Sequence, residues 1–340
     1  MLKFLVTGGS GYVGSVLVSE LIADGHFVKC LDRFFFGDKF LSSPQFDGKL
    51  ELIKDDIRSF DGKHLDDVDV AMDLGSLSND PVGELDPKKT FEINHKGRVR
   101  VASLCKQHGV KHYILPSSAS NYGNQEGTVN EESEVFPLTA YSQANHKAEL
   151  DVLKLNDDNF TTTVLRFSSI YGISPRMRFD LAVNSMALEL FKTGKIIVTG
   201  DGKQRRPFLH IRDAAEVYKL VINAPKDKVA GQIFNVGSDD QNYEISMLAE
   251  EVGRAIGKEY HIEYQGTHDH RSYNASFQKI KSTLGYSPKY SVADGAREVF
   301  NALEDGTLID SIKTKTVEWY KNLQFYNDLI KEVSLDNKIL

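Results

Sequence analysis

The sequence has 340 residues, a length that suits a large α/β domain with a smaller partner better than one small core. Apolar residues make up 41% and charged residues 26% of the chain, as in ordinary soluble globular proteins, while the net charge of −7 argues against nucleic-acid binding, which needs a basic surface. No apolar run approaches the roughly 20 residues that span a bilayer, and the first strand begins too early to leave room for a signal peptide.

Two cysteines, Cys30 and Cys105, lie inside apolar segments. Thiols in such positions are typically buried and do not form a disulfide framework. Cysteines and histidines are not spaced as metal ligands, so we expect no metal site. These features favour a reducing cytoplasm, with no membrane and no nucleic acid as a partner.

Residues 4–22 read as a strand, a glycine-rich turn and a helix. The glycines have the spacing Gly8-x-x-Gly11-x-x-Gly14. One glycine permits the tight turn, one lets the backbone approach a pyrophosphate, and Gly14 lets the helix pack closely on the strand. The start of that helix, at Tyr12 and Val13, offers N–H groups to the pyrophosphate. The stretch therefore predicts a dinucleotide site.

A second strand over residues 28–31 ends in Asp32, which lies 18 residues after Gly14. A carboxylate at this spacing is placed to bind the hydroxyls of the adenosine ribose. Arg33, the next residue, is suited to the 2′-phosphate of NADP, but Asp32 would repel that phosphate. We therefore predict NAD as the cofactor.

The following strands end in residues suited to the same ligand. A strand over residues 50–53 leads to Asp56-Ile57, where a carboxylate can accept from the adenine amino group; the alternative is a solvated acidic turn. A strand over residues 68–74 ends in Gly75-Ser76, whose small side chains suit a backbone that passes close to a cofactor.

Strand and helix patterns continue to alternate, with a helix expected over residues 88–107 and strands over residues 112–115 and 161–166. Such alternation predicts a mostly parallel sheet with helices on both faces, which is a Rossmann-type doubly wound α/β fold.

Beyond Gly172 the loops lengthen and arginines become frequent, which predicts a smaller C-terminal substrate lobe. We expect an NAD-binding Rossmann domain over residues 1–172, to which later segments return, and a lobe for the substrate mainly over residues 173–305. A helical extension over residues 306–340 is either an oligomer contact or a packed appendage.

Several short stretches recur together in one known family. They are residues 7–14, Asp32, residues 56–58, residues 117–123, Tyr141-Ser142, residues 206–210 and residues 279–288. With these, the chain resembles the extended short-chain dehydrogenase/reductase family as far as about Leu303, and within it the nucleotide-sugar epimerases, dehydratases and 4-reductases. The resemblance implies NAD, a nucleotide-diphosphate sugar, hydride transfer at C4 of the sugar, and a homodimer.

The resemblance also implies the catalytic residues. Ser118 matches the family hydroxyl and Tyr141 matches the base, whose phenolate takes the proton of the C4 hydroxyl. A free tyrosine titrates near 10, so its pKa must shift for this role. The family places a lysine four residues later, where this chain has Asn145. We therefore expect slower chemistry or a more alkaline pH optimum.

Other departures bear on the reaction. The 4,6-dehydratases of the family carry Asp-Glu after the hydroxyl residue, where this chain has Ala119-Ser120, so dehydration is disfavoured. In the C-terminal lobe, Arg206 and Arg271 match the arginines that bind the diphosphate. Guanidinium groups suit diphosphate oxygens in geometry and in charge.

The sequence thus predicts three sets of site residues. The catalytic set is Tyr141, Ser118 and Asn145. The cofactor set is Gly8, Gly11, Tyr12, Val13, Gly14, Asp32, Arg33, Asp56, Ile57, Leu74, Gly75, Ser76, Asn94, Tyr141 and Asn145. The substrate set is Ser78, Ser118, Ser120, Arg176, Arg178, Asn184, Arg206 and Arg271.

The predicted function is NAD-dependent epimerisation or C4 dehydrogenation of a nucleotide sugar. A reductase of nucleotide-linked 4-keto sugars is an alternative within the same chemistry. An alternative of another class, motivated by Asn145, is a cofactor-bound protein without catalysis.

Overall fold

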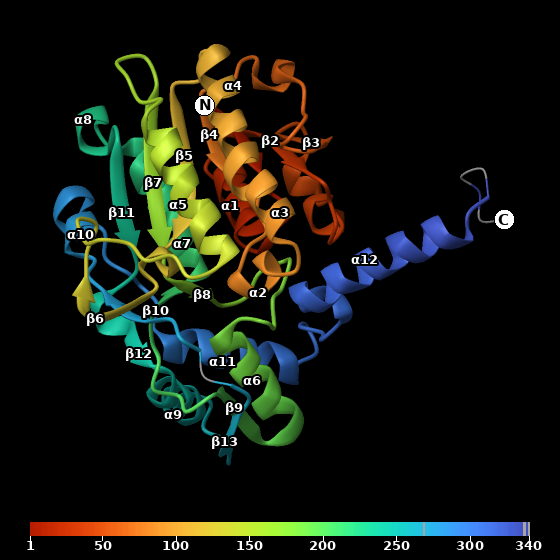
Figure 1. Cartoon of the computed structure of the whole chain (residues 1–340), viewed down its shortest axis with the longest axis vertical. Coiled ribbons are helices and arrows are strands. Elements are labelled where there is room, and N and C mark those ends of the chain that lie inside the picture. Colours follow the sequence, from red (N-terminus) through yellow and green to blue (C-terminus); the bar gives the residue numbers. More distant parts are fainter. Residues whose placement is uncertain (268, 336–337, 339–340) are drawn as a thin grey trace.

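A seven-stranded sheet forms the centre of the larger part of the molecule (Figure 1). The computed structural model describes residues 1–267, 269–335 and 338. The strands of this sheet are β1 (Lys3–Thr7), β2 (Phe27–Asp32), β3 (Leu50–Lys54), β4 (Val70–Asp73), β5 (His112–Ser118), β7 (Thr161–Phe167) and β11 (Gln232–Val236). Their order is β11-β7-β5-β4-β1-β2-β3, and every neighbouring pair is parallel. The predicted fold class is confirmed.

The order of the strands reverses between β1 and β4. β1 pairs with β2 on one side and with β4 on the other. From β1 the chain first adds β2 and β3 in one direction, and it then adds β4 and the later strands in the opposite direction. In open α/β sheets, ligands bind in the crevice outside the carboxyl ends of strands at such a switch point. The glycine turn after β1 and the segment 74–76 after β4 both lie there.

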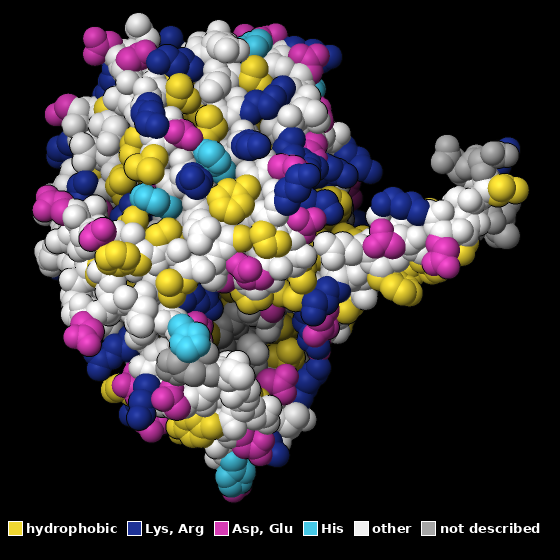
Figure 2. Space-filling view, in the orientation of Figure 1, with side chains coloured by type: hydrophobic (Ala, Val, Ile, Leu, Met, Phe, Trp, Pro, Cys, Tyr) yellow, Lys and Arg dark blue, Asp and Glu magenta, His cyan; other side chains and the backbone are white. Residues whose placement is uncertain are grey.

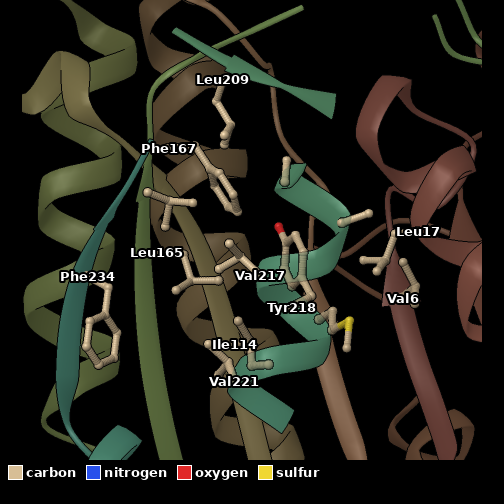
Figure 3. Close-up of a cluster of buried hydrophobic side chains, with 14 of the residues drawn as sticks. Val6, Leu17, Ile114, Leu165, Phe167, Leu209, Val217, Tyr218, Val221 and Phe234 are labelled. Carbon is tan, nitrogen blue, oxygen red and sulfur yellow. The ribbon is translucent and has the colours of Figure 1, made fainter. Parts of the chain in front are cut away.

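Helices cover both faces of the sheet, because the central strands are apolar on both sides. All seven residues of β7 are buried. On one face lie α1 (Tyr12–Ala23) and α7 (Ile211–Asn223), and on the other lie α4 (Arg98–Gln107) and α5 (Ala140–Leu153). Figure 3 shows α7 along the sheet, with Val217, Tyr218 and Val221 among the strand side chains Ile114 and Leu165.

The second, smaller part lies below the sheet in Figure 1. Its strands form the groups β12-β10-β8, β13-β9 and β14-β6. Their bounds are β6 (Asn124–Val129), β8 (Ser169–Tyr171), β9 (Lys195–Thr199), β10 (Arg205–His210), β12 (Asn242–Glu244), β13 (His261–Gln265) and β14 (Ser272–Ala275). Helices α6 (Ala182–Thr193), α9 (Ile245–Ile256) and α11 (Val292–Glu304) pack around a separate apolar cluster. Short helices are α2 (Asp80–Gly83), α3 (Pro87–Thr90), α8 (Lys226–Val229) and α10 (Gln278–Leu284).

The helix expected over residues 88–107 is present without a break, but it is not α-helical throughout. α3 is followed by a π-helical segment, Phe91–Gly97, and α4 begins at Arg98. Asn94 lies in the wide turn, where its Oδ1 accepts from the Leu77 N–H at 2.8 Å and its Nδ2 donates to the Leu77 carbonyl at 2.9 Å. The π-helical turn thus lets a buried amide hold the loop that follows β4.

The C-terminal helix α12 (Thr316–Val333) projects from the body (Figures 1 and 2). Its first turns contact the loop after β2, where Trp319 donates to the Phe35 carbonyl at 2.8 Å and Tyr320 packs edge-on against Phe36. Farther along, apolar side chains are exposed, namely Phe325, Tyr326, Leu329, Ile330 and Val333. Among the residues that the structure describes, no helix is long and apolar enough to cross a membrane.

An ion pair is buried between β7 and α5. Arg166 donates to both carboxylate oxygens of Glu149, from Nε at 3.0 Å and from Nη2 at 2.7 Å, and Asn121 donates to the same carboxylate at 2.9 Å. Burial opposes the charge on Glu149, but Arg166 and a hydrogen bond from His146 outweigh it, so the pKa of Glu149 lies below its usual value.

Replacing Arg166 with methionine should destabilise the protein by about 3–5 kcal/mol at neutral pH, because Glu149 would remain buried without a partner. In the parent, the depressed pKa of Glu149 contributes stability above its unfolded pKa, and this contribution is lost as the pH falls through the folded value. In the variant the penalty should instead shrink on acidification, because protonation removes the unpaired charge. Urea unfolding at several pH values measures both trends.

The double variant Arg166→Met/Glu149→Leu is the control, since an apolar pair of this kind recovers most of the lost stability. A penalty in the single variant that does not change with pH would contradict this account.

Candidate active site

The crevice begins at the turn between β1 and α1. Gly8 has a φ of +65°, and a Cβ at this position would lie 2.7 Å from the backbone of Leu74. A Cβ on Gly14 would lie 2.3 Å from the Gly8 carbonyl oxygen. Gly11 is the N-cap of α1 and supplies no capping side chain, so the first N–H groups of the helix remain available to an anion. The turn therefore suits the predicted pyrophosphate.

Asp32, at the end of β2, lies beside this turn. Its Oδ2 accepts from the Ser10 N–H at 3.0 Å and its Oδ1 accepts from the Phe34 N–H at 2.7 Å. Burial raises the pKa of Asp32, and these N–H groups act in the opposite direction. A carboxylate oxygen has room for a second hydrogen bond, so both oxygens can still accept from ribose hydroxyls.

Arg33 and Asp56 contact each other. The guanidinium of Arg33 lies 2.6 Å from Asp56, and Arg58 donates to both oxygens of the same carboxylate at 2.9 and 2.7 Å. The hydrogen bonds from Arg58 hold the pKa of Asp56 well below its usual range, although burial opposes them. An adenine amino group would have to share the Asp56 carboxylate with two arginines. Arg33 could bind a 2′-phosphate only by giving up its ion pair with Asp56.

The chain after β4 forms the next wall of the crevice. The Gly75 N–H donates to Thr7 Oγ1 at 2.9 Å, and a Cβ on Gly75 would lie 3.1 Å from the Ile57 side chain. Asn94 uses both ends of its amide on Leu77. Gly75 thus packs against Thr7 and Ile57, and the Asn94 amide holds the loop that follows β4; their contact with a cofactor stays a prediction.

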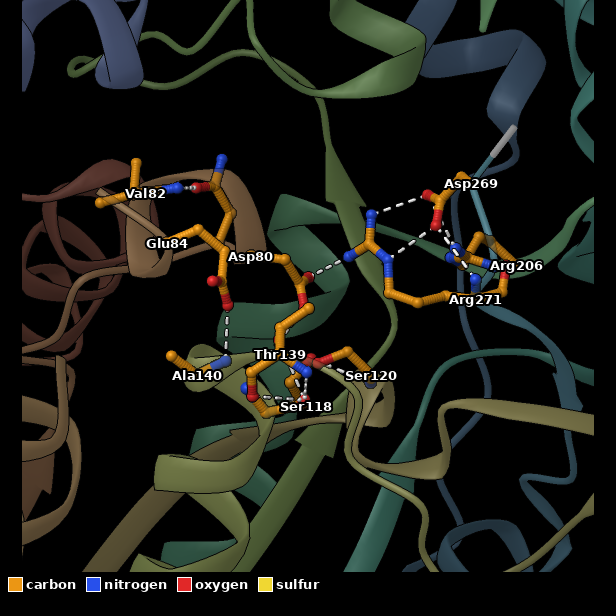
Figure 4. A network of polar contacts seen from close by, with 12 residues as sticks. Asp80, Val82, Glu84, Ser118, Ser120, Thr139, Ala140, Arg206, Asp269 and Arg271 are labelled. Atoms are coloured by element: carbon orange, nitrogen blue, oxygen red, sulfur yellow. Dashed lines mark hydrogen bonds and ion pairs between the residues drawn. The ribbon is translucent and has the colours of Figure 1, made fainter. Parts of the chain in front are cut away.

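Ser118 ends β5, and Tyr141 and Asn145 lie one turn apart on α5. Thr139 caps this helix, since its hydroxyl accepts from the Ser142 N–H and the Ser142 hydroxyl accepts from the Thr139 N–H, both at 3.1 Å. This capping box determines where α5 begins and therefore where Tyr141 lies. Figure 4 shows Ser118 with Ser120, whose N–H donates to the Ser118 hydroxyl oxygen at 3.1 Å.

The surroundings of Tyr141 act in both directions on its pKa. Burial is the largest cause and raises the pKa, and the negative charge of Asp80 raises it further. Arg98 and the neighbouring polar side chains of Ser118 and Asn145 lower it, but the net direction is upward. The structure therefore brings the three predicted catalytic residues together and adds two charged residues to them.

Two buried polar atoms at this place have no hydrogen-bond partner within the described part of the chain. They are Ser120 Oγ and Asn145 Nδ2. A buried polar group without a partner costs about 1–3 kcal/mol, so native proteins rarely leave one without a reason. Both atoms are suited to the hydroxyl groups of a ribose or a sugar.

Arg206 and Arg271 converge on one carboxylate (Figure 4). Asp269 lies 3.0 Å from Arg206 and accepts from Arg271 at 2.9 and 2.7 Å, and Arg271 also forms an ion pair with Asp80. Burial opposes ionisation of Asp269, but the two arginines outweigh it and its pKa is lowered. The two predicted diphosphate ligands thus lie together, with carboxylates in contact with them.

Arg178 and Asn184 connect parts of the chain. Arg178 donates to Asp180 at 2.9 and 3.2 Å and to the Ser78 hydroxyl at 3.1 Å. Asn184 accepts from the Gly172 N–H at 2.9 Å and donates to the Tyr12 hydroxyl at 3.0 Å. These residues link α1 and the loop after β4 to the smaller lobe.

Arg176 lies beside the loop that follows β2. Its guanidinium is 3.5 Å from the centre of the Phe36 ring, and Nη2 donates to Thr316 at 2.9 Å. Burial raises the pKa of Asp32, and the positive charge of Arg176 opposes that rise. The buried Nε of Arg176 has no partner among the described residues. This position associates Arg176 with Asp32 and not with Arg206.

The sequence analysis did not identify Arg98, Asp80 or Asp269 as part of the site. Asp269 stands two residues before Arg271, and a local acid-arginine pair is a signal that was available. Arg98 precedes Val101 and Cys105 on the buried stripe of the expected helix, so an arginine at an apolar position was a signal as well. Asp80 has no comparable local signal.

The parallel sheet, the glycine turn and Asp32 define an α/β dinucleotide-binding protein. The model of the NAD dependent epimerase/dehydratase family matches residues 4–237, which is more than half of the chain. The chain belongs to this family, and NAD is its cofactor. The resemblance and the cofactor predicted from the sequence are confirmed.

Curated relatives cover most of the chain at modest identity. An uncharacterized UDP-glucose epimerase of Bacillus subtilis is 26% identical over 309 residues, covering 86% of this chain and 95% of that protein. UDP-glucuronic acid decarboxylase 1 of Arabidopsis thaliana is 29% identical over 310 residues, covering 86% of this chain and 68% of that protein. The two names describe different reactions on UDP sugars.

A solved structure has the same fold. UDP-glucuronic acid 4-epimerase from Bacillus cereus, in complex with UDP-glucuronic acid and NAD, has a TM-score of 0.80 and 23% identity, over 89% of this chain and 99% of that one. At this identity the likeness extends to the fold alone.

We predict that NAD(H) binds at least about tenfold more tightly than NADP(H), because Asp32 repels a 2′-phosphate. Asp32→Ser should weaken NAD(H) binding by about 1–3 kcal/mol, the usual effect of removing a hydrogen bond to a charged group. Fluorescence titration with both cofactors measures this. Asp38→Ser, at an exposed carboxylate in the same loop, is the control. Tighter binding of NADP(H) by the parent would refute the role of Asp32.

We predict that Arg206→Ala and Arg271→Ala each weaken UDP binding by about 1.5–3 kcal/mol. Asp269→Asn should strengthen it, because this carboxylate competes with the diphosphate for both guanidinium groups. Calorimetry measures all three affinities, with Arg212→Ala as a control at a half-exposed arginine paired with Glu298. Unchanged affinity in both arginine variants would show that the diphosphate binds elsewhere.

Proposed function

We propose that the chain is an NAD-dependent enzyme that oxidises C4 of a nucleoside-diphosphate sugar. It would act either as a 4-epimerase, which returns the hydride to C4, or as a C4 dehydrogenase, which leaves the hydride on the cofactor and releases the 4-keto sugar. The observation that carries the proposal is the convergence of Ser118 and Tyr141 beside the amide nitrogen of Asn145, which has no hydrogen-bond partner within the described part of the chain, at the same sheet edge as the glycine turn. The names of the relatives favour a UDP sugar.

Each residue has a defined role in this proposal. The Tyr141 phenolate takes the proton of the C4 hydroxyl, and Ser118 donates a hydrogen bond to the same oxygen. Ser118 is suited to this because its oxygen already accepts from the Ser120 N–H at 3.1 Å, which leaves its own proton to donate. When bound, NAD would supply the hydride acceptor and a cationic ring that favours the phenolate of Tyr141.

The proposal includes an exchange of anions at the arginine pair. Asp269 and Asp80 contact Arg271, and Asp269 also contacts Arg206. A diphosphate that binds there replaces one set of negative oxygens with another, so the buried arginines keep ionic partners throughout. This exchange also favours ligands with two phosphates over uncharged sugars.

Other reactions of the same family are less favoured by the residues. Dehydration needs an acid near C5 and C6, and Ala119 and Ser120 follow Ser118 here. Reduction of a 4-keto sugar uses the same three catalytic residues, and it remains the alternative within this chemistry. A protein that binds the cofactor without catalysis is the alternative of another class. The homodimer and the cytoplasmic location remain predictions.

The test is to add UDP-glucose, UDP-galactose, UDP-glucuronic acid and UDP-N-acetylglucosamine to the NAD-loaded protein. Absorbance of reduced cofactor and chromatography of the sugars distinguish epimerisation, net oxidation and decarboxylation. We expect at least one sugar to react, and we expect the rate still to rise at about pH 8, because a base with a raised pKa is more fully ionised as the pH increases. Failure of every sugar, and of the corresponding 4-keto sugars, would favour the non-catalytic alternative.

Tyr141→Phe should abolish hydride transfer and leave NAD bound, because only the phenolate oxygen is removed. Tyr264→Phe, at a half-exposed tyrosine of β13, is the matched control and should react like the parent. If Tyr141→Phe reduces NAD with an active sugar as fast as the parent, the proton passes elsewhere, to Ser118 through water or to His146.

A further inference from the structure

Arg98 is a buried cation next to the catalytic helix. It is the first residue of α4, and 2% of its surface is exposed. Its Nη1 donates to Asn145 Oδ1 at 2.9 Å, and its Nη2 donates to the carbonyl oxygens of Asp73 at 2.8 Å and Pro116 at 2.6 Å. Among the described residues no carboxylate forms an ion pair with it.

The contact with Arg98 determines the orientation of the Asn145 amide. A guanidinium group has only N–H donors, so the amide must turn its oxygen toward Arg98 and its NH₂ group away. Asn145 is itself buried, and Nδ2 has no acceptor in hydrogen-bond geometry within the described part of the chain. The amide nevertheless lies near enough to the Tyr141 hydroxyl to favour its ionised form. The NH₂ group of Asn145 is therefore oriented toward the side of the helix on which the Tyr141 hydroxyl lies.

Several charged or titratable groups face Tyr141 from the elements packed around it. They are Asp80 from α2, Arg98 from α4 and Tyr273 from β14. Asp80 disfavours the phenolate, but its carboxylate is shared with Arg271. Arg98 is the group in this set whose charge favours the phenolate.

The negative group that balances the charge of Arg98 is near the guanidinium but forms no ion pair with it in the described part of the chain. The Asp73 carboxylate lies nearby, and burial raises its pKa while Arg98 opposes the rise. That carboxylate accepts from the hydroxyls of Thr7 and Tyr113, while Arg98 contacts the Asp73 carbonyl. Tyr218 and Cys105 also face this pair, and burial raises the pKa of both. The guanidinium therefore remains available to polarise Asn145.

We propose that Arg98 is the cation of the proton-transfer site: it orients the Asn145 amide so that its NH₂ group faces the Tyr141 hydroxyl, and its charge stabilises the phenolate. Arg98 acts through Asn145 and is a positioning residue, not a catalytic one. The proposal rests on the proposed function for the meaning of the phenolate, but the contact network does not depend on which sugar is the substrate.

The test is a titration of Tyr141 without substrate. Tyrosinate formation is followed by near-ultraviolet absorbance, and the curve of each protein is compared with that of the same protein carrying Tyr141→Phe, so that the other tyrosines cancel. Arg98→Met should raise the apparent pKa of Tyr141 by about one unit or more, the usual effect of removing a nearby opposite charge. Arg98→Lys should raise it by less than half as much, because the charge remains and the planar fork is lost.

A charge exchange makes the test specific. Asn145→Lys alone should lower the pKa of Tyr141, and Arg98→Met/Asn145→Lys should return it close to the parent value, because one cation replaces the other beside the phenol. Lys106→Met removes a cation from the same helix, at a residue paired with Asp157, and should leave the titration unchanged.

The proposal is overturned if Arg98→Met is folded and titrates as the parent does, or if the double variant titrates like Arg98→Met. If Arg98→Met does not fold, Arg98→Lys decides, and a curve that superimposes on the parent refutes the proposal. The proposed function is tested separately, by the reduction of NAD with nucleotide sugars. If no sugar reduces NAD, the proposed function is wrong, but the titration of Tyr141 still tests the role of Arg98.

Discussion

Helix α1 meets the end of β1 at a separation that leaves no room for a side chain, since a Cβ on Gly14 would stand 2.3 Å from the Gly8 carbonyl oxygen. This contact points the N-terminus of α1 into the crevice between β1 and β4. It also sets the path to β2, which places Asp32 at the rim, 3.0 Å from the Ser10 N–H of the same turn. If a side-chain methyl group at residue 14 displaced α1, the N-terminus of α1 and Asp32 would both move.

Burial of charge is the second constraint, and the molecule meets it in two ways. Glu149 and Arg166 satisfy each other between β7 and α5 and hold these elements together. Arg98 is buried against carbonyl and amide oxygens, so its charge is solvated without being neutralised by direct contact. The first arrangement serves stability. In the second, the field of the cation reaches neighbouring groups, because no carboxylate in the described part of the chain forms an ion pair with it.

The arginines of the smaller lobe show why charge density alone did not define a binding site. Arg178 binds Asp180 and Ser78 and connects the lobes, while Arg176 stacks on Phe36 in the loop after β2. Arg206 and Arg271 alone converge on one place, through Asp269. In this acidic chain even these two arginines have carboxylate partners, so their common position, and not a lack of partners, distinguishes them.

Ser118 and Tyr141 were assigned from the resemblance to the family. The sequence by itself determined the parallel sheet, the glycine turn and the choice of NAD. These features depend on alternating strand and helix patterns and on short spacings, which act through local backbone geometry. The tertiary structure alone decided which polar groups meet. Arg98 and Asn145 are 47 residues apart, Arg206 and Asp269 are 63 apart, and Arg178 and Ser78 are 100 apart. The π-helical turn at Asn94 could not be predicted from the sequence either, because the Asn94 side chain accepts a hydrogen bond from the Leu77 backbone, which lies in another loop. Contacts of this kind arise only when the order of the strands brings distant segments together, and no local pattern of residues records that order.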